Sequence, residues 1–392
     1  MTGSLFRRFR RITSSGAFIP EIDGLRFVAI SAVVMYHLSG YVVARGGPFR
    51  GDASQSLAAR TFEHGHYGVE LFFVISGFIL ALPFASHALR DTKAVSLRKY
   101  FLRRLTRLEP PYVLSMLLFF AMLVVYVHQS AASLAPRLGA SLLYSHSLIY
   151  GEYSAINPVA WSLEVEIQFY ILVPLLAQLF AIRSTVLRRA VIVGLIATAQ
   201  VCQALLIPEA SRVSLSVLNF MHFFLFGFLL ADVYLVDWRS APAPSHRWDA
   251  VSLAGWPLLP LLWTSESISR WVFPPITFIL YCAAFRGAWS RKVFSMPLIT
   301  TIGGMCYTIY LLHYQIISFI GRYTVSRPVS TSFGVELLWQ LAILGPVILL
   351  VCAIYFVMIE KPCMRPDWPG RLAKWLQARR SGTPADVANQ DS

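Results

Sequence analysis

Apolar segments long enough to cross a lipid bilayer recur along nearly the whole chain, and this repetition limits the fold more than any other feature. Hydrophobic residues make up 56% of the sequence and charged residues 14%, which is typical of a multi-pass membrane protein and not of a soluble domain. Backbone polar groups in lipid have to be satisfied within each segment, so the segments are expected to be helices. We predict an all-α integral membrane protein with about ten transmembrane helices, at residues 24–44, 68–85, 112–128, 161–181, 190–207, 214–236, 249–264, 272–285, 299–320 and 336–358.

The basic residues support this arrangement independently, because lysine and arginine collect in cytoplasmic loops. If the amino terminus is cytoplasmic, 25 of the 34 Lys and Arg residues fall in the predicted inside segments and eight in the outside loops. We therefore predict that both termini face the cytoplasm. Prolines interrupt the segments 249–264 and 272–285, so a count of nine or eleven stays open, with 138–150 as the spare candidate.

The expected domain organisation is simple. We predict a basic cytoplasmic N-terminus over residues 1–23, a membrane domain over 24–360, and a cytoplasmic juxtamembrane segment with a disordered polar tail over 361–392. The basic start followed by an apolar run is similar to a signal peptide. That run carries Arg26 and His37 and lacks a small-residue cleavage site, so we expect it to be retained as the first helix.

Composition also limits the classes of function. The net charge of +14 is spread over short loops between apolar helices, with no basic domain to hold a duplex, so we expect no nucleic acid partner. The five cysteines show no CxxC or Cys/His spacing, and we expect no bound metal. A Walker-type or GxGxxG loop is absent from the sequence, so nucleotide hydrolysis lacks support.

The first apolar span carries an arginine and a histidine, Arg26 and His37. A polar group in hydrocarbon has to find a partner or lose its charge, so titratable residues there usually mark a functional site. A helix rises about 1.5 Å per residue, which places His37 about 16 Å deeper than Arg26 in an apolar layer about 30 Å thick. We predict that Arg26 lies near the cytoplasmic face and His37 deep in the membrane.

Other polar residues reach a similar depth from helices that run in the opposite direction. Glu166 in the fourth span is predicted roughly 20 Å from the cytoplasmic face, and Ser76, His222 and His313 at roughly 16–21 Å. His37 and Glu166 can therefore meet, although depth does not fix lateral position. A buried histidine is expected to be neutral, as a general base must be, and a carboxylate can orient it. The alternative for these histidines is an ordinary interhelical hydrogen bond.

The densest basic patch precedes the third span, in residues 98–112. Arg103, Arg104 and Arg107 stand at i, i+1 and i+4, so on a helix two guanidinium groups share one face and suit bidentate contacts to phosphate. Membrane topology alone also predicts positive charge here, and anionic lipid would bind it. A phosphate-bearing ligand and a lipid-facing patch both remain open.

Six blocks of residues occur in a recognisable order. They are Asp23-Gly-Leu-Arg26 followed by His37, the block Gly68–Gly77, Arg103–Arg107 with Pro110 and Tyr112, Trp161–Tyr170, Tyr307–His313, and Glu360-Lys-Pro362. With these blocks the chain resembles the acyltransferase 3 family of integral-membrane acyltransferases, many of which O-acetylate bacterial surface glycans. The resemblance covers most of the chain.

The sequence departs from the family pattern in small ways. Glu166 is followed by Ile167 where the family often has a second acidic residue, and the role of the additional Glu164 is open. Cys306-Tyr-Thr-Ile-Tyr310 stands where Ser-Tyr-Ser-Leu-Tyr is common. Some members append an esterase-like extracytoplasmic domain. We expect acceptor handling here to occur in the membrane domain or through a partner.

The resemblance implies transfer of an acyl group, acetyl above all, from cytoplasmic acyl-CoA to a hydroxyl of a glycan or glycolipid such as a surface polysaccharide or lipopolysaccharide. It implies a location in the bacterial inner membrane among membrane lipid, with acyl-CoA as co-substrate and no bound cofactor. Basic groups at the cytoplasmic face would hold the CoA phosphates while the thioester reaches the buried histidine.

The resemblance also assigns roles to residues. His37 is the expected base, with Glu166 and Asp23 as further catalytic residues. The expected donor-binding residues are Arg26, Arg103, Arg104, Arg107 and Tyr112. The expected acceptor or oxyanion residues are Ser76, Trp161, Ser162, Gln168, Tyr170, Tyr310 and His313.

Two alternatives stay open at this point. A multi-pass transporter of a small solute or acyl group would also carry broken helices and midplane titratable residues, although no inverted repeat is visible. An acyltransferase could instead modify a lipid or a small secreted metabolite. The sequence gives neither the acyl chain length nor the oligomeric state.

Overall fold

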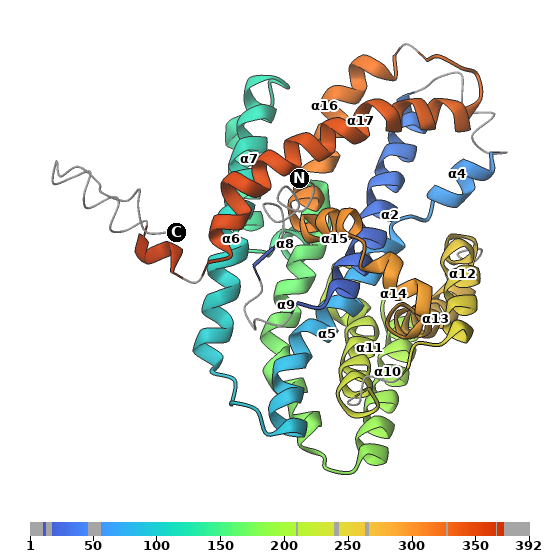
Figure 1. Cartoon of the computed structure of the whole chain (residues 1–392). Helices are drawn as coiled ribbons and strands as arrows, with labels where there is room; N and C mark the ends of the chain where they lie inside the picture. The colour runs from blue at the N-terminus through green and yellow to red at the C-terminus, as the bar shows by residue number, and fades with distance from the viewer. Residues whose placement is uncertain are drawn as a thin grey trace, which may run out of the picture.

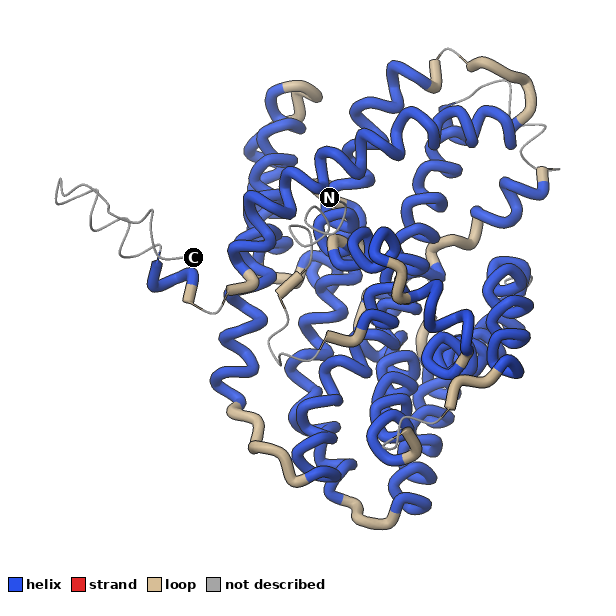
Figure 2. The backbone as a smooth tube through the Cα atoms, in the orientation of Figure 1, coloured by secondary structure: helices blue, strands red, loops and turns tan. Residues whose placement is uncertain are grey.

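The computed structural model describes residues 11–12, 18–45, 56–208, 211–238, 243–262, 266–326, 328–365 and 367–371. Within these ranges the chain folds into helices joined by short loops and contains no strand (Figures 1 and 2). The predicted all-α class is confirmed. The α-helices are α2 (Pro20–Arg45), α4 (Leu57–Phe62), α5 (Tyr67–Arg90), α6 (Leu97–Val125), α7 (Ala131–Leu142), α8 (His146–Tyr150), α9 (Trp161–Leu176), α10 (Thr185–Leu206), α11 (Val217–Val236), α12 (His246–Leu258), α13 (Glu266–Arg286), α14 (Ala288–Phe294), α15 (Pro297–Gly304), α16 (Cys306–Thr324), α17 (Phe333–Tyr355) and α18 (Lys361–Cys363).

The lengths and compositions of these helices agree with a multi-pass membrane protein. Seven helical segments of the described chain are long and apolar enough to cross a bilayer, and α13 with α14 forms an eighth if that pair, bent by 92°, counts as one span. These numbers fall short of the predicted ten. The spans expected at 249–264 and 299–320 account for much of the difference.

Each of these two spans is interrupted in the structure. Helix α12 ends at Leu258 and continues as a 3₁₀ turn, Leu259–Leu262, in the region of Pro257 and Pro260. The predicted ninth span is divided at Met305 into α15 and α16. The count of ten and the cytoplasmic placement of both termini stay predictions.

The packing centre is the crossing of α5 and α11. At this crossing Gly77 faces the backbone of Phe224, and Gly227 faces Val74 and Phe78; a Cβ atom would lie 2.1 Å from the Phe224 carbonyl oxygen in the first case and 2.4 Å from backbone atoms in the second. Glycine is therefore required at both positions, because small residues let membrane helices approach closely. Helix α9 also packs on α5, whereas α2 packs on the other side of the site against α5, α15 and α16 (Figure 1).

Helix α6 shows that the basic patch is continuous with the third span, which was predicted to begin only at residue 112. It runs from Leu97 through Pro110 and Pro111 without a break, so the arginines lie on the same helix as the third span. A proline has no N–H and leaves the carbonyl four residues earlier without its partner. The indole of Trp368 donates to that carbonyl of Thr106, at 3.0 Å. The rest of the predicted tail, from residue 372, lies outside the described residues.

Candidate active site

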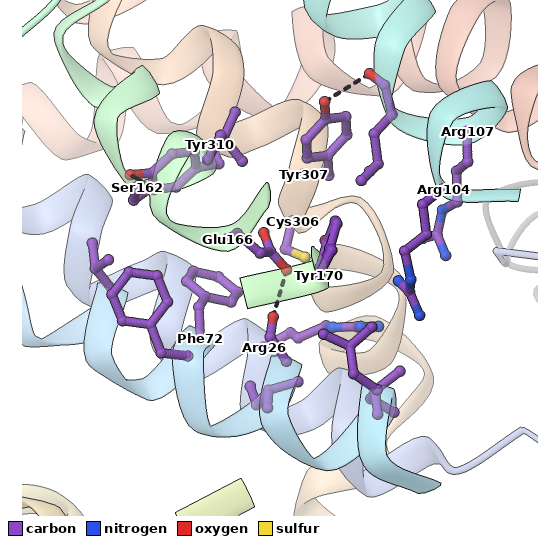
Figure 3. Close-up of a pocket in the computed structure, with 18 of the residues that line it drawn as sticks. Arg26, Phe72, Arg104, Arg107, Ser162, Glu166, Tyr170, Cys306, Tyr307 and Tyr310 are labelled. Carbon is purple, nitrogen blue, oxygen red and sulfur yellow. Dashed lines mark hydrogen bonds between the residues drawn. The ribbon is translucent and has the colours of Figure 1, made fainter. Parts of the chain in front are cut away.

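A cavity of about 130 Å³ lies between α2, α5, α6, α9 and α16. We call it the arginine cavity, after the three arginines in its lining; its charged and hydroxyl lining consists of Arg26, Ser76, Arg104, Arg107, Ser162, Glu166, Tyr170, Tyr307, Tyr310 and Glu360. Figure 3 shows Arg104 and Arg107 at one end and Ser162 and Tyr310 at the other. The arginine end belongs to the part of α6 that the charge pattern predicts to be cytoplasmic.

Glu166 projects from α9 into this cavity and is held by the hydroxyl group of Ser76. This hydroxyl donates to Glu166 Oε1 at 2.5 Å. Tyr170, one helical turn along α9, lines the same cavity. The sequence placed Ser76 and Glu166 at one depth, and the structure brings them into contact. The carboxylate is thereby fixed in one orientation inside the cavity.

Arg26 is oriented by Asp23, three residues earlier on α2. Arg26 Nη1 lies 2.9 Å from Asp23 Oδ1, and Arg11 Nε lies 2.8 Å from the same carboxylate. Asp23 is 1% exposed and is not part of the cavity lining. Two arginines share this buried carboxylate, which keeps its charge compensated. Asp23 was predicted to be catalytic, but its geometry is that of a group that positions Arg26.

Arg104 and Arg107 reach the cavity, and Arg103 does not. Arg104 and Arg107 are three residues apart on α6 and face the cavity together. Arg103, four residues before Arg107, is exposed. The Arg104 guanidinium lies 4.8 Å from the ring centroids of both Tyr100 and Tyr170. The buried Nε atoms of Arg104 and Arg107 have no hydrogen-bond partner within the described residues. Buried donors of this kind are unusual in a folded protein and suit an anionic ligand.

A second, larger cavity of about 710 Å³ adjoins the first. We call it the histidine cavity, because His37, His64, His66 and His222 line it. Its other polar or aromatic lining residues include Tyr36, Glu70, Tyr153, Trp161, Gln203, Asn219 and Arg270. In the described part of the chain no group of three or more His, Cys, Asp or Glu residues is arranged to hold a metal ion.

His37 lies in this second cavity and is not paired with Glu166. Its ring centroid lies 4.9 Å from that of Tyr36 and 5.1 Å from those of His313 and Tyr314. Glu166 lines the other cavity. Depth in the membrane was predicted for both residues, but α5 packs against both α2 and α9 and separates their lateral positions. The structure therefore does not bring His37 and Glu166 together as a pair.

Val69 and Tyr310 line both cavities, so the two spaces adjoin at these two side chains. The Tyr310 hydroxyl donates to the Val159 carbonyl at 3.0 Å and lies 2.6 Å from the Ser162 hydroxyl. These contacts hold the phenol ring in place. We call Val69 and Tyr310 the partition.

Some predicted site residues lie elsewhere. The Tyr112 hydroxyl donates to the Ser141 carbonyl at 2.9 Å, which ties α6 to α7. Gln168 Oε1 accepts from the Val217 amide at 2.9 Å and holds the start of α11. Neither residue lines a cavity. Trp161 lines the histidine cavity, whereas His313 is buried behind His37. Tyr112 and Gln168 are used in this way because a buried backbone N–H or C=O group needs a hydrogen-bond partner.

The open role of Glu164 is also resolved. Its Oε2 atom accepts from the amide of Ser147 at 2.8 Å, and the residue is 0% exposed. This contact joins α9 to α8, outside both cavities. Glu164 is therefore a structural carboxylate, and Glu166 is the one that reaches the site.

Two carboxylates of the site were missed as site residues. Glu70 lines the histidine cavity, and Glu360 lines the arginine cavity, where it accepts from Thr308 at 2.5 Å. Both stood within quoted sequence blocks and both interrupt apolar runs. The signal that could have found them is the one used for His37, a titratable group in an apolar span.

Three buried polar atoms of the histidine cavity lack a protein partner in the described structure. They are Glu70 Oε2, Gln203 Oε1 and His222 Nδ1. Gln203 Oε1 only accepts hydrogen bonds, and Glu70 Oε2 only accepts them when its carboxyl group is ionised, so both suit a ligand rich in hydroxyl donors. Aromatic rings of Tyr153 and Trp161, 6.1 Å apart, add an apolar surface to the same cavity.

Comparison with known proteins gives consistent matches. The model of the acyltransferase 3 family, described as an acyltransferase domain, matches residues 19–357. O-acetyltransferase OatA of Staphylococcus aureus, strain NCTC 8325 / PS 47, is 24% identical over 345 residues, which cover 82% of this chain and 54% of the relative. A Staphylococcus aureus protein of strain COL, named as a candidate O-acetyltransferase, is 25% identical over 336 residues, 79% of this chain and 52% of the relative. The chain thus spans about half the length of these curated relatives. No solved structure matches it significantly.

Proposed function

The chain belongs to the acyltransferase 3 family, and from this premise we propose that it is a membrane O-acyltransferase. In this proposal it moves an acetyl group from cytoplasmic acyl-CoA to a hydroxyl of a glycan or glycolipid at the outer side of the bacterial inner membrane. The observation that carries the proposal is the pair of cavities that adjoin at Val69 and Tyr310, one with unpartnered guanidinium donors and one with His37.

The arginine cavity is the donor site of this proposal. The guanidinium groups of Arg104 and Arg107 contact the CoA phosphates, and the pantetheine arm extends past Glu166 toward the partition. A cavity of about 130 Å³ is well below the roughly 300–1,000 Å³ of a site that encloses a drug-sized ligand. It suits the acyl end of the donor, with the nucleotide outside at the arginine end.

The histidine cavity is the acceptor site. Its volume of about 710 Å³ is within that range for ligand sites. The unpartnered oxygens of Glu70 and Gln203 support a ligand with several hydroxyl groups. The relative OatA is named an O-acetyltransferase, and this name supports transfer of the acyl group to a hydroxyl oxygen.

The reaction then needs one proton carrier. As the acceptor oxygen bonds to the thioester carbonyl carbon, His37 takes the hydroxyl proton. The carbon–sulfur bond breaks, the sulfur leaves with the bonding electrons as a thiolate, and the thiolate takes the proton from His37 to give free CoA and the ester. The Ser162 hydroxyl lies beside the partition, 2.6 Å from the Tyr310 hydroxyl, and is suited to donate a hydrogen bond to the developing oxyanion once it turns from Tyr310, whose own proton is donated to the Val159 carbonyl.

The experiment that tests this proposal measures acyl transfer by the purified protein in liposomes. Acetyl-CoA labelled in the acetyl group is supplied with a panel of short oligosaccharides, and labelled product is followed by mass spectrometry. A positioned general base contributes about 10²- to 10⁴-fold, so His37→Ala should lower kcat by that factor.

The matched control is His246→Ala, which removes an exposed histidine paired with Asp249 away from both cavities. It should transfer the label at the wild-type rate. Full activity of a correctly inserted His37→Ala protein would remove His37 as the base. Absence of any labelled acceptor with the wild-type protein would count against acyl transfer to a glycan.

A further inference from the structure

His313 stands directly beside the proposed base, on the neighbouring helix α16. The two imidazole rings have centroids 5.1 Å apart and planes inclined by 46°. His313 is 0% exposed and lines neither cavity, whereas His37 lines the histidine cavity. His313 is thus placed behind His37, on the side away from the acceptor.

The hydrogen bonds of His313 fix its tautomer. Its Nδ1 atom lies 2.9 Å from the carbonyl oxygens of both Ile309 and Tyr310. A carbonyl oxygen only accepts, so Nδ1 carries the ring proton and Nε2 carries a lone pair. That Nε2 atom is buried and has no hydrogen-bond partner in the part of the chain that the structure describes.

A buried acceptor without a partner is rare in a folded protein and calls for an explanation. The ring centroids of His37 and His313 lie 5.1 Å apart. At this separation, rotation of the His37 ring can bring one of its nitrogens to hydrogen-bond distance of a nitrogen of His313. The rings of Tyr36 and Tyr314 also adjoin His37, and both meet its ring edge-on, at interplanar angles of 64° and 87°.

We propose that His313 is a positioning residue for His37, whose ring N–H it accepts at Nε2 when substrate is bound. This inference rests on the proposed function, in which His37 is the base. With one nitrogen of His37 donating to His313, the other nitrogen carries the lone pair and faces the acceptor hydroxyl. The neutral His313 thereby takes the orienting role that the sequence suggested for Glu166.

Two substitutions at the same position separate this role from a structural one. His313→Asn keeps an amide donor near the place of Nδ1, for the two carbonyls, but offers nothing to His37. His313→Gln places a carbonyl oxygen near the place of Nε2. We expect His313→Asn to lower kcat by about 10- to 100-fold, the range found for groups that orient metal-binding histidines, with KM for acetyl-CoA and oligosaccharide unchanged. His313→Gln should recover most of that loss.

The control is His146→Asn. His146 is also a buried histidine whose Nδ1 faces a backbone carbonyl, that of Glu152, and whose Nε2 is unpartnered, but it lies outside both cavities. It should keep the wild-type kcat. The inference is overturned if His313→Asn keeps the wild-type kcat, or if the Asn and Gln variants fall equally. Either result, with an active wild-type protein and an inactive His37→Ala, would leave the proposed function intact. An inactive wild-type protein would instead contradict the proposed function itself.

Discussion

The two cavities differ in the kind of polar atom that each leaves without a protein partner. In the arginine cavity these atoms are the Nε donors of Arg104 and Arg107 and one oxygen of Glu360. In the histidine cavity they are the oxygens of Glu70 and Gln203 and one nitrogen of His222. Unpartnered donors with positive charge suit phosphate, and unpartnered acceptors suit hydroxyl groups. The difference supports the proposal that each cavity takes a ligand of different chemistry.

The two cavities also differ in their size and in how far their polar groups are held in place. In the arginine cavity, Glu166 is fixed by Ser76, and Arg26 by Asp23. The histidine cavity is more than five times larger, at about 710 Å³ against about 130 Å³. An extended thioester would require a small site whose polar groups are already held in place. A carbohydrate would require a larger site with room for several hydroxyl groups.

The largest effect that sharpens this comparison is expected at the two cavity arginines. Each charge-assisted hydrogen bond contributes about 1.5–3 kcal/mol, so the double substitution Arg104→Ala and Arg107→Ala should raise KM for acetyl-CoA by about 10²-fold or more. KM for the oligosaccharide should not change. Steady-state kinetics of both substrates in liposomes measures the two values.

Arg103→Ala provides the matched control, because Arg103 is on the same helix, carries the same charge and is exposed. It should leave both KM values at those of the wild-type protein. An equal rise in KM for acetyl-CoA from Arg103→Ala would mean that the basic segment acts through its general charge. A rise for the oligosaccharide alone would exchange the assignments of the two cavities.

A smaller effect is expected on the other side of the partition. Glu70→Gln replaces an unpartnered carboxylate oxygen by an amide, and a hydrogen bond of this kind contributes about 0.5–1.5 kcal/mol. KM for the oligosaccharide should rise roughly three- to tenfold, with KM for acetyl-CoA unchanged. Glu152→Gln, in an exposed carboxylate paired with Arg137, is the control. If Glu70→Gln raises KM for acetyl-CoA instead, the histidine cavity is not a separate acceptor site.

Much of the fold could be predicted from the pattern of apolar runs and charges. The helices around Arg26, Ser76, Glu166 and His313 all occur where the sequence placed them. The divided ninth span was not predicted, because its break at Met305 depends on how α15 packs on α2. Hydropathy reports the polarity of a segment and not the bends that packing imposes.

Many residues that line the two cavities were named from the sequence, but their pairing was not. Depth along a helix placed His37 and Glu166 at one level, and the structure separates them into two cavities. Tyr112 and Gln168 were predicted as ligand contacts, but each satisfies a backbone group. Which face of a helix meets which neighbour depends on the whole packing, which one sequence does not contain.

The most direct test of the central claim is the sidedness of the reaction. Liposomes that contain the wild-type protein are loaded with labelled acetyl-CoA, and the oligosaccharide is added only outside. The two-cavity account predicts label on the outside oligosaccharide, with none on His37→Ala liposomes. The account is contradicted if label appears on the oligosaccharide only when both substrates are on the same side of the membrane. It is also contradicted if labelled acetyl-CoA crosses the membrane while the oligosaccharide stays unmodified.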